Sequence, residues 1–192
     1  MVGIDEVGRG PIAGPTTVGC VCIEYTKERA DYLHSLKIRD SKKLSPQKRM
    51  ARLEMVRQWK KEGWLNYSVA SIPPKIIDVI GISPSIRRAL HLALRRLNID
   101  IENTALILDG GLRANKKYNE QTTIIKGDEK EPLIALASIV AKIHRDKYME
   151  RVAEIYPKYS FEGHKGYGTR KHYKSIKKYG LTTLHRKSFL RD

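Results

Sequence analysis

The sequence has few cysteines, and their spacing limits what they can do. Cys20 and Cys22 are the two present among 192 residues, and one residue separates them. On a strand, that spacing places both side chains on one face, too close along the chain for an ordinary disulfide. A four-cysteine zinc site is excluded, because it needs a second pair. We therefore expect both cysteines to be small core residues.

Long hydrophobic runs are also missing. No stretch of about 18 uninterrupted apolar residues occurs, so the sequence predicts no membrane span. Asp5, Glu6 and Arg9 fall where the apolar core of a signal peptide would lie, which argues against such a peptide. The length suits one domain with a sizeable core. We expect a single, soluble, cytoplasmic domain over residues 1–192.

Negative charge is scarce. Lys and Arg number 37 against 21 Asp and Glu, a formal net charge of +16, and a domain this basic usually binds a polyanion. Between His164 and Arg191, nine Lys and Arg occur without any Asp or Glu. Three tyrosines are interleaved with them, and aromatic rings can pack on sugars and bases. We interpret residues 157–192 as a basic, helical nucleic-acid-binding segment rather than a solvated face.

Periodicity and helix-start signals predict strands interleaved with helices, which is typical of an α/β domain. The expected strands are residues 1–5, 15–25, 64–72, 104–108 and 121–126, and the expected helices are residues 46–61, 76–80, 84–97, 132–156 and 170–180. Ser45-Pro46 and Ser83-Pro84 each combine a capping hydroxyl with proline at the first helical position. The helix from Pro132 is apolar nearly all round in its first half, so we expect it to be buried.

The stretch GIDEVGRGPIAGP, residues 3–15, carries the first candidate chemistry. Asp5 and Glu6 can hold a divalent cation. The glycines of Gly8-Arg9-Gly10 allow the backbone to approach a phosphodiester closely. Adjacent residues on a regular strand face opposite ways. The two acids therefore share a site only if the strand twists or ends there.

Further acids follow other predicted strands. Asp109 comes directly after the apolar run TALIL, and Asp128 lies two residues beyond QTTIIK. Ligands gather at strand ends in such sheets, so we expect these acids to converge with those of the first motif. Asp146, in HRDK, is an alternative to Asp128, and the residue types alone leave both open.

Six blocks in one order resemble the ribonuclease HII family, the type 2 ribonucleases H. They are GIDEVGRGPIAGP, DSKKLS at residues 40–45, LDGG at 108–111, KGDEK at 126–130, ASIVAKIHRDK at 137–147 and GHKGYGTRKH at 163–172. The resemblance covers nearly the whole chain and implies the α/β ribonuclease H-like fold, a mixed central β-sheet flanked by helices, with a small C-terminal helical region. It also implies an endonuclease on RNA/DNA hybrids that cuts 5′ of single ribonucleotides in duplex DNA, in ribonucleotide removal.

The resemblance also implies a metal site at Asp5, Glu6, Asp109 and Asp128, and its KGD block favours Asp128 over Asp146. Mg²⁺ and Mn²⁺ prefer oxygen ligands. Two such ions, about 3.5–4 Å apart, can activate a water and stabilise the leaving oxygen. The expected products are a 3′-hydroxyl and a 5′-phosphate. We predict that Asp5 bridges the two ions, with Glu6 and Asp109 completing the first site and Asp128 at the second or positioning water.

Substrate contacts are implied in the same way. The backbone of Gly8-Arg9-Gly10 would contact the ribose 2′-hydroxyl and its phosphate, and the ring of Tyr167 would pack on the following sugar. The remaining predicted substrate-binding residues are Ser41, Lys42, Lys43, His164 and Thr169. Lys42 or Lys43 would reach a phosphate near the cut, and His164 and His172 are candidates for backbone phosphate contacts.

Glu131 is a departure, since the family usually has serine there, and it would add negative charge near the metal site. Gly-Arg-Gly favours type 2 over type 3 relatives, and we expect no room for the extra N-terminal domain of the latter. Alternatives are a junction resolvase, disfavoured by Gly-Arg-Gly and GYGT, and a binding protein without catalysis, disfavoured by the four acids. We expect a monomer that binds RNA/DNA hybrids and ribonucleotide-containing duplexes, and the C-terminus shows no clear clamp-binding peptide.

Overall fold

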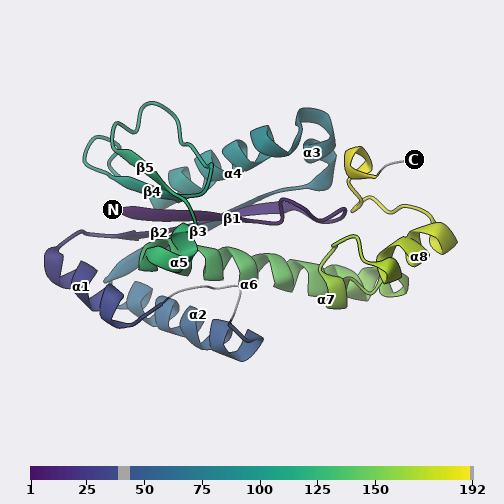
Figure 1. The fold of residues 1–192 in the computed structure, drawn as a ribbon, viewed down its shortest axis with the longest axis horizontal. Helices are drawn as coiled ribbons and strands as arrows, with labels where there is room; N and C mark the ends of the chain where they lie inside the picture. Colours follow the sequence, from purple (N-terminus) through teal and green to yellow (C-terminus); the bar gives the residue numbers. More distant parts are fainter. Residues whose placement is uncertain (39–43, 191–192) are drawn as a thin grey trace.

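A mixed five-stranded sheet forms the centre of the computed structural model, which describes residues 1–38 and 44–190 (Figure 1). The strands are β1 (Val2–Val7), β2 (Thr16–Ile23), β3 (Leu65–Ile72), β4 (Leu106–Asp109) and β5 (Gln121–Ile124), in the spatial order β3-β2-β1-β4-β5. β1, β2 and β3 pair antiparallel, whereas β4 runs parallel to both β1 and β5. The predicted mixed sheet is therefore confirmed.

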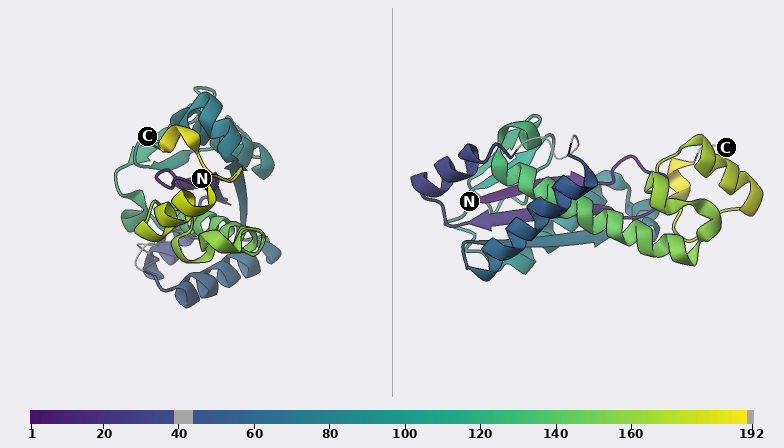
Figure 2. Two further views of the ribbon diagram at one scale, coloured as in Figure 1. Left: turned by 90° about the vertical axis from the view of Figure 1, so that its right-hand side faces the viewer. Right: turned by 90° about the horizontal axis from the view of Figure 1, so that it is seen from below.

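Helices cover both faces of this sheet. The helices of the described residues are α1 (Lys27–Ser35), α2 (Pro46–Lys61), α3 (Pro74–Ile80), α4 (Ile82–Leu97), α5 (Gly127–Lys130), α6 (Pro132–Ile155), α7 (Phe161–His164) and α8 (Arg170–Tyr179), with 3₁₀ turns at Pro157–Tyr159 and Lys187–Phe189. α3 and α4 lie on one face, and α1, α2 and α6 lie on the other. α7 and α8 extend beyond one end of the sheet (Figure 2).

α6 lies unusually close to the strands because glycines face it. A Cβ on Gly3 would come within 2.4 Å of the Leu133 carbonyl carbon, and one on Gly19 within 2.4 Å of the Ala137 oxygen. Any side chain at these two positions would push the helix away from β1 and β2. This close packing confirms the predicted buried helix, and it brings the middle of α6 beside the end of β1.

Helix starts follow the capping signals in two places and depart from them in one. The hydroxyls of Ser45 and Thr169 accept hydrogen bonds from the backbone at the starts of α2 and α8, as expected. α4 instead begins at Ile82, because Gly81, with φ +83°, takes the cap position. Pro84 then lies in the first turn, where an N–H has no intrahelical partner to lose. The predicted Ser83-Pro84 start is therefore wrong by two residues.

Two expectations drawn from what the sequence lacks can be compared with the structure. Cys20 and Cys22 are free thiols that pack against the same hydrophobic cluster between the sheet and α4. Cys20 is buried and Cys22 is partly buried, so their shared face is confirmed. Within residues 1–38 and 44–190, no helix has the length and apolar character needed to cross a bilayer.

Candidate functional site

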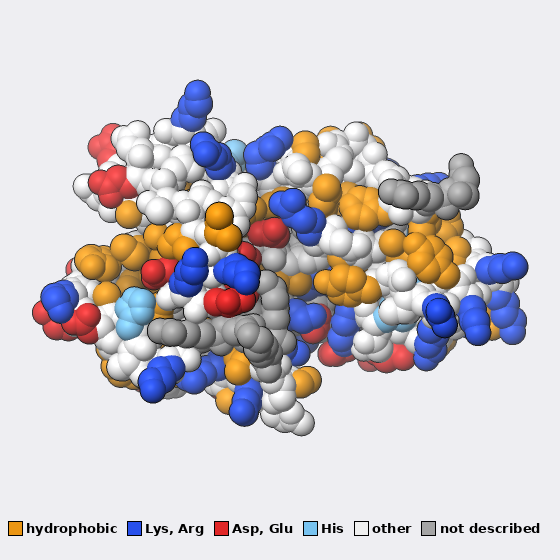
Figure 3. All heavy atoms as spheres, in the orientation of Figure 1, with side chains coloured by type: hydrophobic (Ala, Val, Ile, Leu, Met, Phe, Trp, Pro, Cys, Tyr) orange, Lys and Arg blue, Asp and Glu red, His pale blue; other side chains and the backbone are white. Residues whose placement is uncertain are grey.

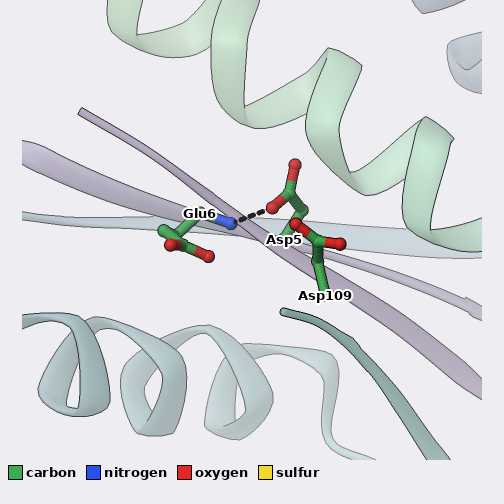
Figure 4. A group of neighbouring side chains, drawn as sticks. All are labelled: Asp5, Glu6 and Asp109. Atoms are coloured by element: carbon green, nitrogen blue, oxygen red, sulfur yellow. Dashed lines mark hydrogen bonds between the residues drawn. The ribbon is translucent and has the colours of Figure 1, made fainter. Parts of the chain in front are cut away.

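Three acids converge where β4 ends. Asp5, Glu6 and Asp109 each place a carboxylate oxygen within 4.8 Å of the other two (Figure 4). β4 stops at Asp109, whereas β1 continues to Val7 along β2. Beyond Asp109, one side of β1 is therefore left open. The two adjacent acids therefore lie within β1, beside the end of β4.

Backbone amides hold two of these carboxylates in place. The amide of Glu6 donates to Asp5 Oδ1 at 2.7 Å, a bond drawn in Figure 4. The amide of Gly127, at the start of α5, donates to Asp109 Oδ1 at 2.6 Å. A Cβ on Gly127 would lie 3.3 Å from that same oxygen. The α5 turn is thereby fixed against the end of β4.

The electrostatics of this acidic cluster favour a bound cation. Asp5 is 2% exposed, and burial raises its pKa to about 8, with the charges of Glu6 and Asp109 adding to the rise and a hydrogen bond to Ser138 opposing it. Burial also raises the pKa of Glu6, although Arg9 Nε, 3.3 Å from Glu6 Oε1, opposes this shift. Desolvation and like charges both disfavour ionised carboxylates. A divalent cation reverses that balance, so these oxygen ligands fit Mg²⁺ or Mn²⁺.

Asp128, the predicted fourth acid, lies outside the group of three acids that converge at the end of β4. Asp128 is 2% exposed and follows Gly127, whose amide binds Asp109. Among the described residues, the carboxylates within 4.8 Å of one another are those of Asp5, Glu6 and Asp109, without Asp128. Asp146 instead forms an ion pair on α6, with its Oδ1 2.8 Å from Lys142 Nζ. The choice of Asp128 over Asp146 stays a prediction, and this placement supports it.

Glu131, the departure noted in the sequence, faces another part of the molecule. Its Oε2 lies 3.9 Å from Nε2 of His34 on α1. It lines a cavity together with Met1 and Pro132. The charge that we expected near the metal site is therefore directed toward α1.

A cleft of about 490 Å³ connects the acidic cluster with the predicted substrate-contacting residues. Its lining is Glu6, Val7, Gly8, Arg9, Gly10, Arg49, Ser138, Lys142 and Tyr167. Figure 3, drawn in the orientation of Figure 1, shows acidic side chains among Lys and Arg near the middle of the visible face, and further basic side chains over α8. One opening thus joins the acidic cluster to a surface suited to a polyanion.

The two glycines of Gly8-Arg9-Gly10 serve different purposes. Gly8 has φ +88°, and a Cβ there would lie 2.4 Å from Arg145 Nε. Only glycine fits that position without strain. A Cβ on Gly10 would have Tyr167 Cε1 as its nearest neighbour, at 4.0 Å. A side chain at Gly10 would therefore enter the space between the loop and the tyrosine ring.

Tyr167 has a fixed backbone and an accessible ring. The side chain is 47% exposed and lines the cleft. Its carbonyl accepts from the Thr169 amide at 2.8 Å, and it is 2.9 Å from His172 Nδ1. The Thr169 hydroxyl caps α8 by accepting from the His172 amide, so its predicted role in substrate binding would be added to a structural one.

The predicted phosphate-binding histidines have partners inside the protein. His164 Nε2 is 2.8 Å from the Tyr159 carbonyl, and its Nδ1 accepts from the Gly166 amide at 3.2 Å. His172 is fully buried, and burial lowers its pKa to about 4. A phosphate contact by His164 would require one of these bonds to break, and His172 has no exposed surface to offer. Ser41, Lys42 and Lys43 lie outside the described residues.

Sequence reasoning missed two buried arginines, Arg145 and Arg186, both 0% exposed. Arg145 donates to the carbonyls of Pro15 and Ala13, at 2.9 and 3.2 Å. Burial lowers the pKa of Arg186 to about 9, and nearby Arg145 adds to the shift. Spacing could have indicated the first residue, because positions 138, 142 and 145 share one helix face. Composition could not indicate Arg186, which counts as one more cation of the basic segment.

Comparisons with known proteins agree with one another. The family model for ribonuclease HII matches residues 2–192. The ribonuclease HII of Caldicellulosiruptor bescii is 42% identical over 192 residues, which cover 100% of this chain and 87% of the relative. The structure of the PCNA:RNase HII complex from Archaeoglobus fulgidus matches with a TM-score of 0.78 at 24% identity, covering 100% of this chain and 96% of that chain. Ribonuclease H2 from Pyrococcus horikoshii OT3 matches with a TM-score of 0.72 at 26% identity, covering 97% and 92%.

Proposed function

The chain belongs to the ribonuclease HII family, and from this premise we propose that it cuts duplex DNA on the 5′ side of a single ribonucleotide. The family implies hydrolysis of the RNA strand in RNA/DNA hybrids, the activity of a type 2 ribonuclease H. Cleavage would leave a 3′-hydroxyl and a 5′-phosphate, and the cellular role would be ribonucleotide removal. One observation carries the proposal: a single cleft is lined by Glu6 of the acidic cluster, by the Gly-Arg-Gly loop and by Tyr167.

The acids would hold Mg²⁺ or Mn²⁺, with Asp5 as the shared ligand and Asp128 joining Glu6 and Asp109. Two bound ions would activate a water and stabilise the leaving oxygen of an in-line displacement. The protein's own contribution is to hold the carboxylates ready, through the amides of Glu6 and Gly127. Preorganised ligands and dipoles need little rearrangement at the moment of reaction.

Recognition of the ribose would come from the other side of the cleft. A protein distinguishes RNA from DNA through the 2′-hydroxyl. The backbone of Gly8-Arg9-Gly10 can approach the sugar and its phosphate, because neither glycine has a side chain in the way. The exposed ring of Tyr167 can pack on the adjoining sugar. Contact on two sides of one ribose would allow recognition of a single ribonucleotide within DNA.

Residues 157–192 would bind the flanking duplex. A shallow basic pocket on this segment is lined by Gly168, Arg170, Tyr173, Lys174 and Lys177. Such contacts bind phosphates regardless of sequence and release counterions. We expect affinity to fall with salt, with a log–log slope of about −0.7 to −0.9 per phosphate neutralised.

Partners other than nucleic acid form a smaller part of the proposal. The Archaeoglobus fulgidus relative was solved as a complex with PCNA, and a clamp contact is compatible with this chain. We propose no clamp-binding segment, since none is clear in the sequence. The monomeric state and the cytoplasmic location stay predictions.

The decisive experiment is a cleavage assay mapped to the nucleotide. Labelled duplexes that are all DNA, contain one ribonucleotide, or pair RNA with DNA are incubated with Mg²⁺, Mn²⁺ or a chelator. We expect metal-dependent cuts in the hybrid and one cut 5′ of the single ribonucleotide, with the all-DNA duplex intact. Cutting of DNA junctions instead would favour a resolvase. Chelator-insensitive binding without any cut would indicate a binding protein.

A further inference from the structure

A C-terminal segment lies against the loop that follows Gly-Arg-Gly. The amide of Gly14 donates to the Leu184 carbonyl and the amide of Arg186 donates to the Ile12 carbonyl, both at 2.8 Å. Ala13 and His185 form the antiparallel bridge between them. Residues 184–186 thus run beside residues 12–14 as a short added strand. The bonded residues of the two segments are at least 170 positions apart in the chain, so this pairing forms only in the folded protein.

Arg186 fastens the loop from this added strand. Its Nε donates to the Gly14 carbonyl at 2.9 Å, its Nη1 to the Arg9 carbonyl at 3.0 Å and its Nη2 to the Gly8 carbonyl at 2.7 Å. All three nitrogens of one guanidinium therefore bind a single loop. A planar fork of donors suits this arrangement, and the point charge of lysine does not reproduce it. Burying a charge this completely is costly unless it is well hydrogen-bonded.

His185, the neighbouring residue, is connected to Tyr167 through His172. The amide of Thr182 donates to His185 Nδ1 at 2.8 Å, so the proton of a neutral His185 is on Nε2. That Nε2 donates to His172 Nε2 at 3.0 Å, which leaves His172 Nδ1 to donate to the Tyr167 carbonyl at 2.9 Å. These tautomers follow from the hydrogen-bond network. The result is one continuous relay that ends on the backbone of Tyr167.

We propose that the dipeptide His185-Arg186 positions the two groups that would contact the ribose, the Gly-Arg-Gly loop and Tyr167, and thereby sets the selectivity of the cleft for a 2′-hydroxyl. Arg186 fixes the Gly-Arg-Gly backbone, and His185, acting through His172, fixes Tyr167. Both are positioning residues, because neither lines the cleft. The gap that they control is narrow, since a Cβ on Gly10 would lie 4.0 Å from the tyrosine ring. This inference rests on the proposed function, since it assigns the ribose as the group held in that gap.

Two variants test the two arms separately. Arg186→Lys keeps the positive charge but loses the fork, and His185→Asn keeps an acceptor for the Thr182 amide but loses the donor to His172. On a duplex with one ribonucleotide, we expect KM to rise roughly ten- to a hundredfold in each, because small misplacements of binding groups are costly. Mn²⁺ affinity, measured by calorimetry, should stay at the wild-type value. Arg57→Lys, in an exposed pair with Glu54, is the matched control and should leave KM unchanged.

Hydrogen exchange gives a readout that does not depend on cleavage. The amides of Ile12 and Ala13 donate to the Gly166 carbonyl and so report on both segments. Arg186→Lys should therefore speed exchange at the Gly14 amide and spare the Thr169 amide, and His185→Asn should do the reverse. A merely structural role would lower the melting temperature and the active fraction, speed exchange throughout, and leave KM alone. Wild-type KM together with wild-type exchange in either variant overturns the proposal.

The two hypotheses fail in different ways. If the wild-type protein cleaves no ribonucleotide-containing substrate, the proposed function fails, and the exchange experiment still tests whether the dipeptide holds the loop and the tyrosine. If Arg186→Lys does not fold, His185→Asn alone decides, because a normal KM in that variant contradicts control of Tyr167 through the relay.

Discussion

The two sides of the cleft are built by opposite means. The acidic wall (Asp5, Glu6 and Asp109) is charged, and the sheet places it through the register and length of two neighbouring strands. The neutral wall (the backbone of residues 8–10 and the ring of Tyr167) consists of peptide groups and one ring, and the buried guanidinium of Arg186 behind it holds it in place. The side that would bind cations therefore carries its charge on the acidic side chains themselves. The groups that would read a sugar are uncharged, although the side chain of Arg9 projects from the same loop and pairs with Glu6.

The two walls also differ in the free energy cost of burying their charged groups. In the acidic wall, burial and like charges disfavour ionisation, which raises the pKa of Asp5 to about 8. A cation relieves this cost, so the wall is completed by its ligand. In the neutral wall, the guanidinium of Arg186 is already satisfied by three carbonyls. That wall is complete before anything binds, and we expect it to be rigid without metal.

The largest expected effect comes from removing an acid. Asp109→Asn keeps the shape of the side chain but removes the charge that would hold the cation, and we expect kcat to fall by at least about a thousandfold. Asp128→Asn should behave alike if Asp128 is the fourth acid. Asp146→Asn is the matched control, because its carboxylate pairs with Lys142. Single-turnover cleavage at saturating Mn²⁺ measures all three, and a wild-type rate for Asp109→Asn would contradict the nuclease centre.

The acidic wall was easier to predict from sequence than the neutral wall. An aspartate after a short apolar strand is visible in the chain, and strand-end reasoning correctly brought Asp109 to Asp5 and Glu6. The reason for their meeting was not visible, because the point at which β4 ends relative to β1 depends on pairing between distant segments. Asp128 shows the same limit, since its position depends on the turn after β5.

The neutral wall depends on features that composition hides. Arg186 counted as one more exposed cation, yet it is 0% exposed. Burial of an arginine depends on three distant carbonyls, which no local pattern reports. Local signals worked where the physics is local, as in the Ser45 and Thr169 caps. They failed at α1, where Leu33 is the one residue of the helix that is buried, so the helix shows little apolar periodicity.

The next largest effect is the loss of stability expected from Gly8→Ala. Comparing it with a control glycine separates packing against Arg145 from simple backbone strain. Gly8→Ala forces a Cβ to within 2.4 Å of Arg145 at φ +88°. We expect it to reduce the free energy of unfolding by roughly 2–4 kcal/mol, combining left-handed strain with overpacking. Gly110→Ala is the control, because φ is +57° and no heavy atom lies within 4 Å. It should cost about 1 kcal/mol. Urea denaturation measures both, and equal losses would show that packing against Arg145 adds nothing.

A pH experiment tests the free energy cost of ionising the buried Asp5 in the acidic wall. The folded pKa of Asp5, about 8, lies above the ordinary aspartate value of 3.8, so the metal-free native state holds a proton that the unfolded state has lost. Stability should therefore fall as pH rises from about 4 to about 8. Asp5→Asn removes this dependence, and we expect it to stabilise the chelated protein at pH 8 relative to wild type by up to a few kcal/mol.

The free energy of unfolding is compared at pH 5 and pH 8, with chelator and with Mn²⁺, for the wild type and for Asp5→Asn. Cation binding should restore wild-type stability at pH 8 and release a proton, which calorimetry in buffers of different ionisation enthalpy can detect. The Asp5→Asn variant should show neither response. Equal pH dependence in the two proteins would mean that the acidic wall carries no such cost.

The smallest effect should come from the ring of the neutral wall. Tyr167→Ala removes a stacking surface that is 47% exposed, and losing one base- or sugar-packing contact costs roughly 1–3 kcal/mol. We expect kcat/KM on a single-ribonucleotide duplex to fall about ten- to a hundredfold, while Mn²⁺ affinity is unchanged. Tyr25→Ala, which removes a ring that is 56% exposed outside the cleft, is the control. We expect Tyr167→Ala and Asp109→Asn to have additive effects on binding of substrate and of metal. A loss of Mn²⁺ affinity in Tyr167→Ala would show instead that the walls are coupled.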